Sequence, residues 1–209
     1  MSKQAHILAV EIKDPEFEGY EERDPIEYIN QGTVWIGPRP YLETLDPHEE
    51  AHPYSASILQ LIPYVVLRHE GKVLTYVRPT KGNEGRLHNN VSVGIGGHVD
   101  LQDAVHEDSV LDIDQTLKLS CIREVQEELG LEIEGSDLEW KGLIVRRDRS
   151  VDRVHLGVVA EIELDDDMKA QIEPNAEIGE IQFIDPETFA EQMAGNEIEA
   201  WTKAVLFID

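Results

Sequence analysis

The stretch REVQEELGL, residues 123–131, decides the fold prediction, because a helical pattern of apolar residues coincides there with a dense group of carboxylates. The pattern predicts a helix over 114–129, ended by Gly130, which supplies the positive φ of a helix C-terminus. Steps of three and four residues return to one helix face, so three carboxylates share a sector about 100° wide: Glu124, Glu127 and Glu128. The apolar residues on the opposite side are Cys121, Ile122, Val125 and Leu129.

Clustered carboxylates on one helix face are a small liability unless a cation accompanies them. Like charges at this spacing destabilise a helix by a few tenths of a kcal/mol, about 0.2–0.5 per pair. Hard cations with oxygen ligands, chiefly Mg²⁺, suit such a group. The alternative is a solvated acidic face, which is common in a chain with 43 Asp and Glu.

Upstream, Gly94-Ile95-Gly96-Gly97-His98-Val99 predicts a strand that ends in glycines. Glycine lets backbone approach a ligand or a metal closely. The glycine-rich strand end therefore strengthens the prediction of a site near the three glutamates.

Together these residues resemble the signature of the Nudix hydrolases (MutT-like), G-x5-E-x7-R-E-U-x-E-E-x-G-U, in which U is apolar. The second half of the signature is matched at every fixed position: Arg123, Glu124, Val125, Glu127, Glu128, Gly130 and Leu131. The resemblance implies an α/β (α+β) fold, an α/β/α sandwich with a mixed sheet, over residues 58–206.

The first half of the signature departs from this pattern. Counting from Gly97, the pattern places the first Glu at 103 and the Arg at 111, whereas the Arg stands at 123, twelve residues later. Asp103 is the forward match to the first Glu, and Gln115 is the match counted back from Arg123. We interpret residues 104–114 as a loop inserted before the helix.

The resemblance also implies the roles of individual residues. Gly97, through its carbonyl, Glu124, Glu127 and Glu128 would bind Mg²⁺ (or Mn²⁺), and Arg123 would orient the loop and the carboxylates. Family members often take a general base or a further ligand from a late loop, where Glu177 and Glu180 are equal candidates here.

Cationic residues between the predicted hairpin and the glycine-rich strand are candidates for contacts with substrate phosphates: Arg78, Lys81, Arg86 and His88. Solvation of the surface is the alternative for each of them. No dinucleotide-binding loop, phosphate loop or nucleophile elbow is present in the sequence.

The chain divides by composition into an N-terminal extension, residues 1–54, and a main domain, residues 55–209. Six prolines among many acids interrupt residues 14–54, and we expect the extension to pack on the main domain. Strand patterns occur at 7–12, 33–36, 58–68, 72–78, 91–95, 138–147, 151–164 and 180–184, with a turn at 148–150 and later helices at 186–193 and 197–206.

The 209 residues contain 18 Lys and Arg against 43 Asp and Glu, a net charge of −25. Such a charge opposes binding to nucleic acid or to anionic membrane surfaces, and an anionic substrate would require a cation as mediator. The single Cys121 forms no internal disulfide and fits a core position. With no apolar run of membrane-spanning length, the chain is expected to be cytoplasmic.

These observations predict a divalent-metal-dependent hydrolase that cleaves the diphosphate bond of a nucleoside diphosphate derivative or a related phosphoanhydride. The displaced first Glu leaves open a non-catalytic nucleotide-binding or regulatory module of the same fold. An isoprenoid-type isomerase of the related fold would need a cysteine on the metal face, whereas Cys121 is predicted on the opposite side. Family members are often dimers, so the resemblance also implies a possible homodimer.

Overall fold

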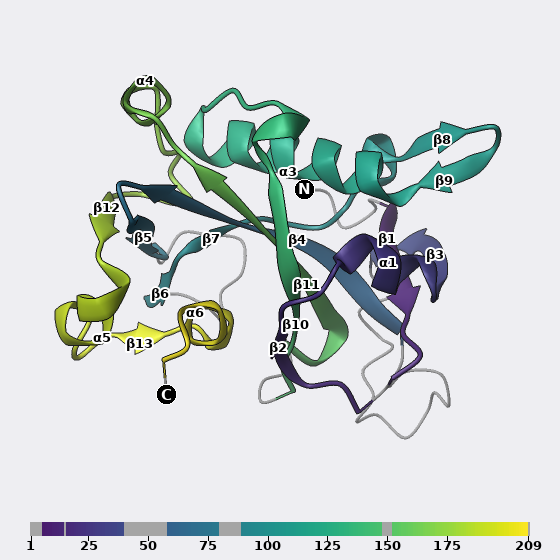
Figure 1. Ribbon diagram of the computed structural model, residues 1–209, viewed down its shortest axis with the longest axis horizontal. Helices are drawn as coiled ribbons and strands as arrows, with labels where there is room; N and C mark the ends of the chain where they lie inside the picture. Colours follow the sequence, from purple (N-terminus) through teal and green to yellow (C-terminus); the bar gives the residue numbers. More distant parts are fainter. Residues whose placement is uncertain (1–5, 15, 40–57, 80–88, 148–151, 209) are drawn as a thin grey trace. The chain divides into compact units, whose positions relative to one another are not determined.

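The computed structural model describes residues 6–14, 16–39, 58–79, 89–147 and 152–208. Two compact units can be distinguished. The first unit comprises Met1–Pro63, Gly97–Cys121 and Trp140–Val159, and the second comprises Tyr64–Gly96, Ile122–Glu139 and Ala160–Asp209. Three long elements have residues in both units (Figure 1): β4 (Ile58–His69), α3 (Ile113–Leu129) and β11 (His155–Glu163).

The first unit is built on antiparallel strand pairs. β1 (His6–Glu11) pairs on one side with β3 (Thr33–Pro38) and on the other with the start of β4, where Val10 lies opposite Leu59. β2 (Gly19–Glu21) pairs with β10 (Glu139–Val145). The short helix α1 (Pro25–Asn30) begins after Asp24, whose carboxylate accepts hydrogen bonds from two backbone N–H groups of the first turn.

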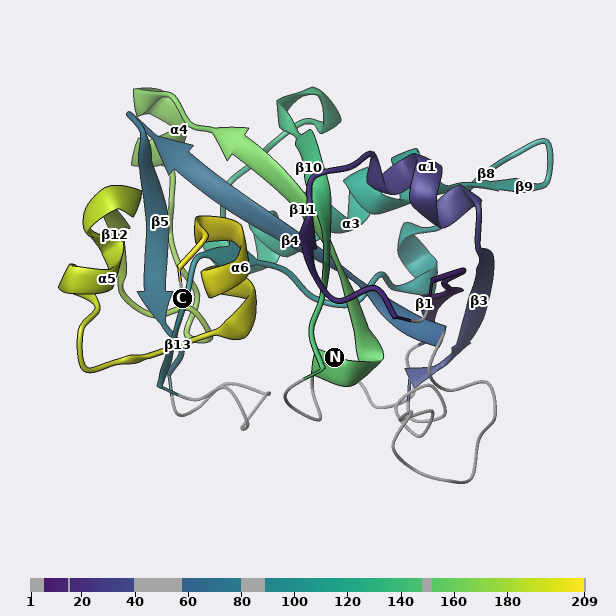
Figure 2. The same ribbon diagram turned by 60° about the horizontal axis from the view of Figure 1, so that its bottom comes forward.

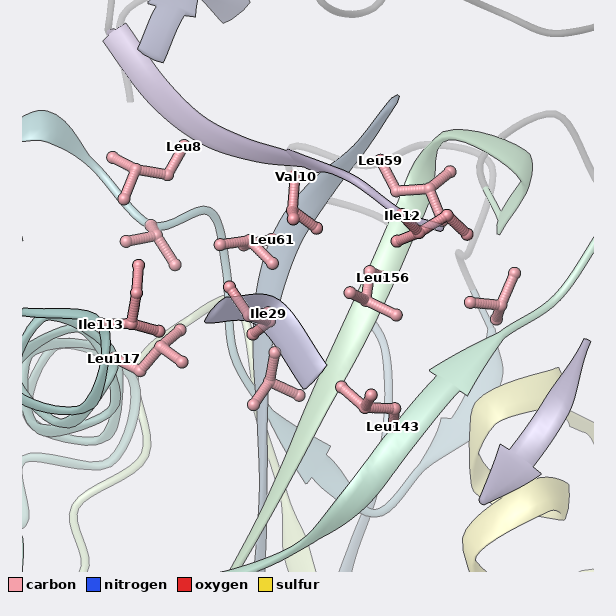
Figure 3. Packing of buried hydrophobic residues seen from close by; sticks show 13 residues of the cluster. Leu8, Val10, Ile12, Ile29, Leu59, Leu61, Ile113, Leu117, Leu143 and Leu156 are labelled. Carbon is pink, nitrogen blue, oxygen red and sulfur yellow. The ribbon is translucent and has the colours of Figure 1, made fainter. Parts of the chain in front are cut away.

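A cluster of buried aliphatic residues forms the core of the first unit (Figure 3). Its members alternate along the strands, one lies on α1 and two lie on the first turns of α3, so each strand contributes one apolar face. They are Leu8, Val10, Ile12, Ile29, Leu59, Leu61, Val99, Ile113, Leu117, Leu143, Val145, Leu156 and Val158.

Most of residues 104–114, predicted as a loop, form a β-hairpin over 105–112, and the last two residues begin α3. β8 (Val105–Glu107) and β9 (Val110–Asp112) pair antiparallel, and they lead directly into α3 (Figure 1). Asp108 and Ser109 take positive φ at the turn between them. Before the hairpin, the 3-10 turn Leu101–Asp103 holds Asp103 in a buried position, where its carboxylate accepts a hydrogen bond from the Asp100 N–H.

The second unit contains a mixed set of strands (Figure 2). The end of β4 pairs with β5 (Lys72–Val77) and with β7 (Gly94–Ile95), and β5 pairs with β12 (Ile181–Ile184) and β6 (Asn90–Ser92). β13 (Glu197–Ile198) adds to β6 in parallel. The remaining elements of the second unit are the 3-10 turns Gly135–Asp137 and Pro186–Thr188 and the helices α4 (Asp166–Ala170), α5 (Phe189–Gln192) and α6 (Ala200–Leu206). The first unit also contains the 3-10 turn Asp152–Val154.

The mixed α/β class predicted from the sequence is therefore confirmed, as is the helix over 114–129. The predicted helix over 197–206 is wrong at its start, because Glu197 and Ile198 pair with β6 and the helix begins at Ala200. The predicted turn at 148–150 lies outside the described residues. No helix among the described residues is long and apolar enough to cross a membrane.

Candidate active site

The last two turns of α3 carry the glutamates of the signature, and a later loop is hydrogen-bonded to the end of this helix. Gly130 follows with a φ of 65°, and its N–H donates to the Gln126 carbonyl. Beyond it, the N–H groups of Glu173 and Asn175 donate to the carbonyls of Leu129 and Glu128 at 2.7 and 2.8 Å. The final carbonyls of a helix have no partner within it, so these bonds join the loop to the end of α3.

Arg123 lies between two of the three glutamates. Its Nη1 contacts Glu124 Oε1 at 2.6 Å and Glu127 Oε2 at 3.6 Å. Glu124 is buried, whereas the side chain of Glu127 is 54% exposed. A guanidinium so close to a buried carboxylate offsets the cost of its burial. Arg123 thus pairs with both carboxylates, and the orienting role that the family resemblance implies for it stays a prediction.

Glu128 is a carboxyl group whose pKa is raised well above its ordinary value by its surroundings. It is half-buried, and its Oε2 is fully buried without a hydrogen-bond partner in the described structure. Burial, together with the charges of Glu124 and Glu177, raises the pKa of Glu128 to about 8. The cation Arg78 and a hydrogen bond from the Gly96 backbone oppose this rise. In native structures a buried acceptor oxygen without a donor is commonly satisfied by an ordered water or an ion.

Arg78 follows β5 and is held by a buried carboxylate. Its Nε donates to Glu199 Oε1, and its guanidinium lies over the Tyr76 ring, 5.3 Å from the centroid. Burial disfavours the charge of Arg78, but Tyr76 and Glu199 outweigh burial and raise the pKa of Arg78 above its ordinary value. Tyr76 is fixed in turn, because its hydroxyl donates to the Gly94 carbonyl at 2.9 Å. The site therefore holds a permanent cation near Glu128.

The second unit brings together seven of the residues predicted for the site, namely Arg78, Arg123, Glu124, Glu127, Glu128, Glu177 and Glu180. Glu177 and Glu180 are both exposed; the charge of Glu177 raises the pKa of Glu128, and Glu180 lies immediately before β12. Gly97 belongs to the first unit, so its carbonyl stays a predicted ligand. Lys81, Arg86 and His88 lie outside the described residues.

No group of three or more His, Cys, Asp and Glu residues in the described chain is arranged to hold a metal ion. In this structure Glu124 and Glu127 face Arg123, and Glu128 carries the oxygen without a partner. The metal-ligand set therefore remains a prediction.

Cys121 is fully buried, as the sequence predicted for a core residue.

Sequence analysis missed two residues that shape this site, Asn175 and Glu199. Each acts through partners far away in the chain, Asn175 on the end of α3 and Glu199 on Arg78. Glu199 was predicted inside a helix. In a chain with a net charge of −25, an acidic residue at a helical position is common and does not by itself indicate a site. The asparagine after Pro174 was a weak turn signal, and turn chemistry could have drawn attention to it.

Comparison with known proteins identifies the family. Protein YmaB of Bacillus subtilis (strain 168) is 30% identical over 150 residues, which cover 71% of this chain and 70% of that protein. This chain superposes on the crystal structure of Tm1382, a Nudix hydrolase by assignment, with a TM-score of 0.67 at 25% identity. The match covers 97% of this chain and 96% of Tm1382. No family model matches the chain.

A Nudix hydrolase from Alicyclobacillus acidocaldarius shows the same fold at 16% identity, with a TM-score of 0.52 over 71% of this chain and 90% of its own. The signature residues and these likenesses lead to one assignment: the chain belongs to the Nudix family and is a Nudix-type hydrolase.

Proposed function

We propose that this chain hydrolyses the diphosphate bond of a nucleoside diphosphate derivative or a related phosphoanhydride, and that it requires Mg²⁺ or Mn²⁺. The observation that carries this proposal is the Glu128 carboxyl group, whose buried Oε2 has no hydrogen-bond partner among the described residues and lies in a site with four further charged groups. Those groups are Arg78, Arg123, Glu124 and Glu127.

The donor set fits a hard divalent cation, because carboxylate and carbonyl oxygens are the ligands that Mg²⁺ prefers. Glu124, Glu127, Glu128 and the Gly97 carbonyl would hold it. A bound cation of this kind neutralises charge on the phosphates and makes water a better nucleophile. It also reconciles an anionic substrate with a chain of net charge −25.

The residues of the chain supply the remaining functions in this proposal. Arg78, held by Glu199 and Tyr76, is a preorganised cation for a substrate phosphate. Arg123 keeps Glu124 in place by their 2.6 Å ion pair. A late-loop carboxylate, Glu177 or Glu180, would take the proton of the attacking water.

The test is a panel of nucleotide sugars, dinucleotides and nucleoside triphosphates, incubated with Mg²⁺ and scored for phosphate-containing products. Glu127→Gln should lose most of the hydrolysis seen with the wild type. Glu132→Gln is the matched control, because Glu132 is an exposed glutamate just beyond α3 in the same unit. Full activity in Glu127→Gln would contradict the proposed site.

The same panel tests the non-catalytic alternative, which the displacement of the first signature Glu favours. Binding of a nucleotide without turnover would support that alternative. Asp103, the forward match to that Glu, is buried, and its carboxylate accepts the Asp100 N–H within the turn Leu101–Asp103.

A further inference from the structure

One side chain in the second unit joins the late loop to the end of α3. Asn175 Nδ2 donates to the Glu127 carbonyl at 2.9 Å, while Asn175 Oδ1 accepts from the N–H groups of Glu177 and Ile178 at 2.7 and 3.1 Å. The amide therefore uses its donor on the helix and its acceptor on the loop. Two backbone bonds flank it, from the Asn175 N–H to the Glu128 carbonyl and from the Gly179 N–H to the Asn175 carbonyl.

These bonds have a directional consequence. The Oδ1 bonds form an Asx-type turn that fixes the backbone of residues 175–178, and the Nδ2 bond fixes that turn to the helix that carries the signature glutamates. The carbonyls of two consecutive signature residues, Glu127 and Glu128, are both occupied by Asn175. The loop thus has one register relative to the carboxylates of α3.

We propose that Asn175 is a positioning residue that locks Glu177 beside the signature glutamates and thereby selects Glu177, rather than Glu180, as the carboxylate that accepts the proton of the attacking water. This inference rests on the proposed hydrolysis. In that step the water oxygen bonds to phosphorus, the bridging P–O bond breaks with its electron pair staying on the leaving oxygen, and the water proton moves to the Glu177 carboxylate.

The surroundings of the two candidates separate them. The Glu177 N–H donates to Asn175 Oδ1 at 2.7 Å, and the same Asn175 side-chain amide donates to the Glu127 carbonyl, so the backbone of Glu177 is tied through one side chain to the end of α3. Glu180 follows Gly179, whose φ of 73° redirects the chain, and precedes the β12 residues that pair with β5. Its position is set by the sheet edge and not by the end of α3.

The experiment compares hydrolysis with backbone protection in Asn175→Ala, Asn175→Asp, Glu177→Gln, Glu180→Gln and the double variant Asn175→Ala/Glu177→Gln. General acid–base catalysis contributes about 10²- to 10⁴-fold, and small misplacements cost up to about 10²-fold. We therefore expect kcat to fall about tenfold or more in Asn175→Ala with KM within about twofold, and to fall further in Glu177→Gln.

The double variant should equal Glu177→Gln, because a residue that acts through Glu177 has no effect once the carboxylate is gone. Asn175→Asp retains the acceptor oxygen for the turn and loses the donor to Glu127, so its loop amides should stay protected while kcat still falls. Asn196→Ala is the matched control: Asn196 donates to the Met193 carbonyl in another turn of the same unit, and its loss should leave kcat unchanged.

Amide hydrogen exchange gives a readout that does not depend on turnover. The Glu177 and Ile178 amides should exchange at least about tenfold faster in Asn175→Ala than in the wild type or in Glu177→Gln. Four results would each overturn the proposal. They are unchanged amide exchange in Asn175→Ala, wild-type kcat in Asn175→Ala or Asn175→Asp, a double variant whose loss of kcat is the product of the two single losses, and a loss of kcat in Glu180→Gln but not in Glu177→Gln. A wild type that hydrolyses nothing refutes the proposed function instead, and the choice of Glu177 with it, while the exchange result still decides the loop lock.

Discussion

Metal uptake by this site should release a proton, and Glu128 is the group that loses it. Burial raises the pKa of Glu128 to about 8 from an ordinary value of 4.5. At pH 7 about nine-tenths of such carboxyls are protonated, whereas a metal ligand must be ionised. Each Mg²⁺ or Mn²⁺ bound at pH 7 should therefore displace close to one proton, and the apparent affinity should weaken about tenfold for each pH unit below 8.

Isothermal titration calorimetry of Mn²⁺ binding at pH 7, in two buffers of different ionisation enthalpy, measures this proton directly. The wild type and Glu132→Gln should show the release, and Glu128→Gln should not. Mn²⁺ binding without proton release, or an affinity that is constant between pH 6 and pH 8, would refute the role assigned to Glu128.

The same shift has a consequence for the metal-free protein. Between pH 4.5 and about 8 the folded chain keeps the Glu128 proton while the unfolded chain has lost it. The contribution of Glu128 to the free energy of unfolding therefore falls as pH rises through this window and levels off above it. The difference in the free energy of unfolding between the wild type and Glu128→Gln, measured by denaturation at each pH, isolates this contribution. A difference that rises with pH in this window would contradict the assignment.

Three further substitutions test the packing around the site and the core. Glu199→Gln removes the buried charge that partners the half-buried Arg78, and urea denaturation should show a loss of about 3 kcal/mol. A small loss would indicate that the pair is solvated. Gly94→Ala places a Cβ 2.1 Å from the Tyr64 ring, and we expect a lower melting temperature and about 1–3 kcal/mol of destabilisation, whereas wild-type stability would show that the ring moves freely. Leu117→Ala opens the core of the first unit and should cost about 2–5 kcal/mol by the same denaturation assay; a loss below 1 kcal/mol would mean that this cluster is loosely packed.

Sequence patterns predicted the elements whose periodicity is strong. The sequence predicted α3 because its apolar residues recur at helical spacing and Gly130 follows its last residue. The longer strands were readable from runs of β-branched and apolar residues. By contrast, β8 and β9 are three residues each and carry His106, Glu107 and Asp112, so their local composition resembles a polar loop. Pairing between the two strands, and not propensity, made this insertion a hairpin.

The sequence by itself determined the chemistry of the site, since the spacing of Glu124, Glu127 and Glu128 is a property of one helix. Tertiary structure decided how each group is tuned. The Arg78 and Glu199 pair joins residues 121 positions apart, and Asn175 lies 48 positions from the carbonyl that it binds. The pKa of each group depends on its burial and on nearby charges. Both are set by contacts between segments that are distant in the chain, and local sequence patterns do not predict those contacts.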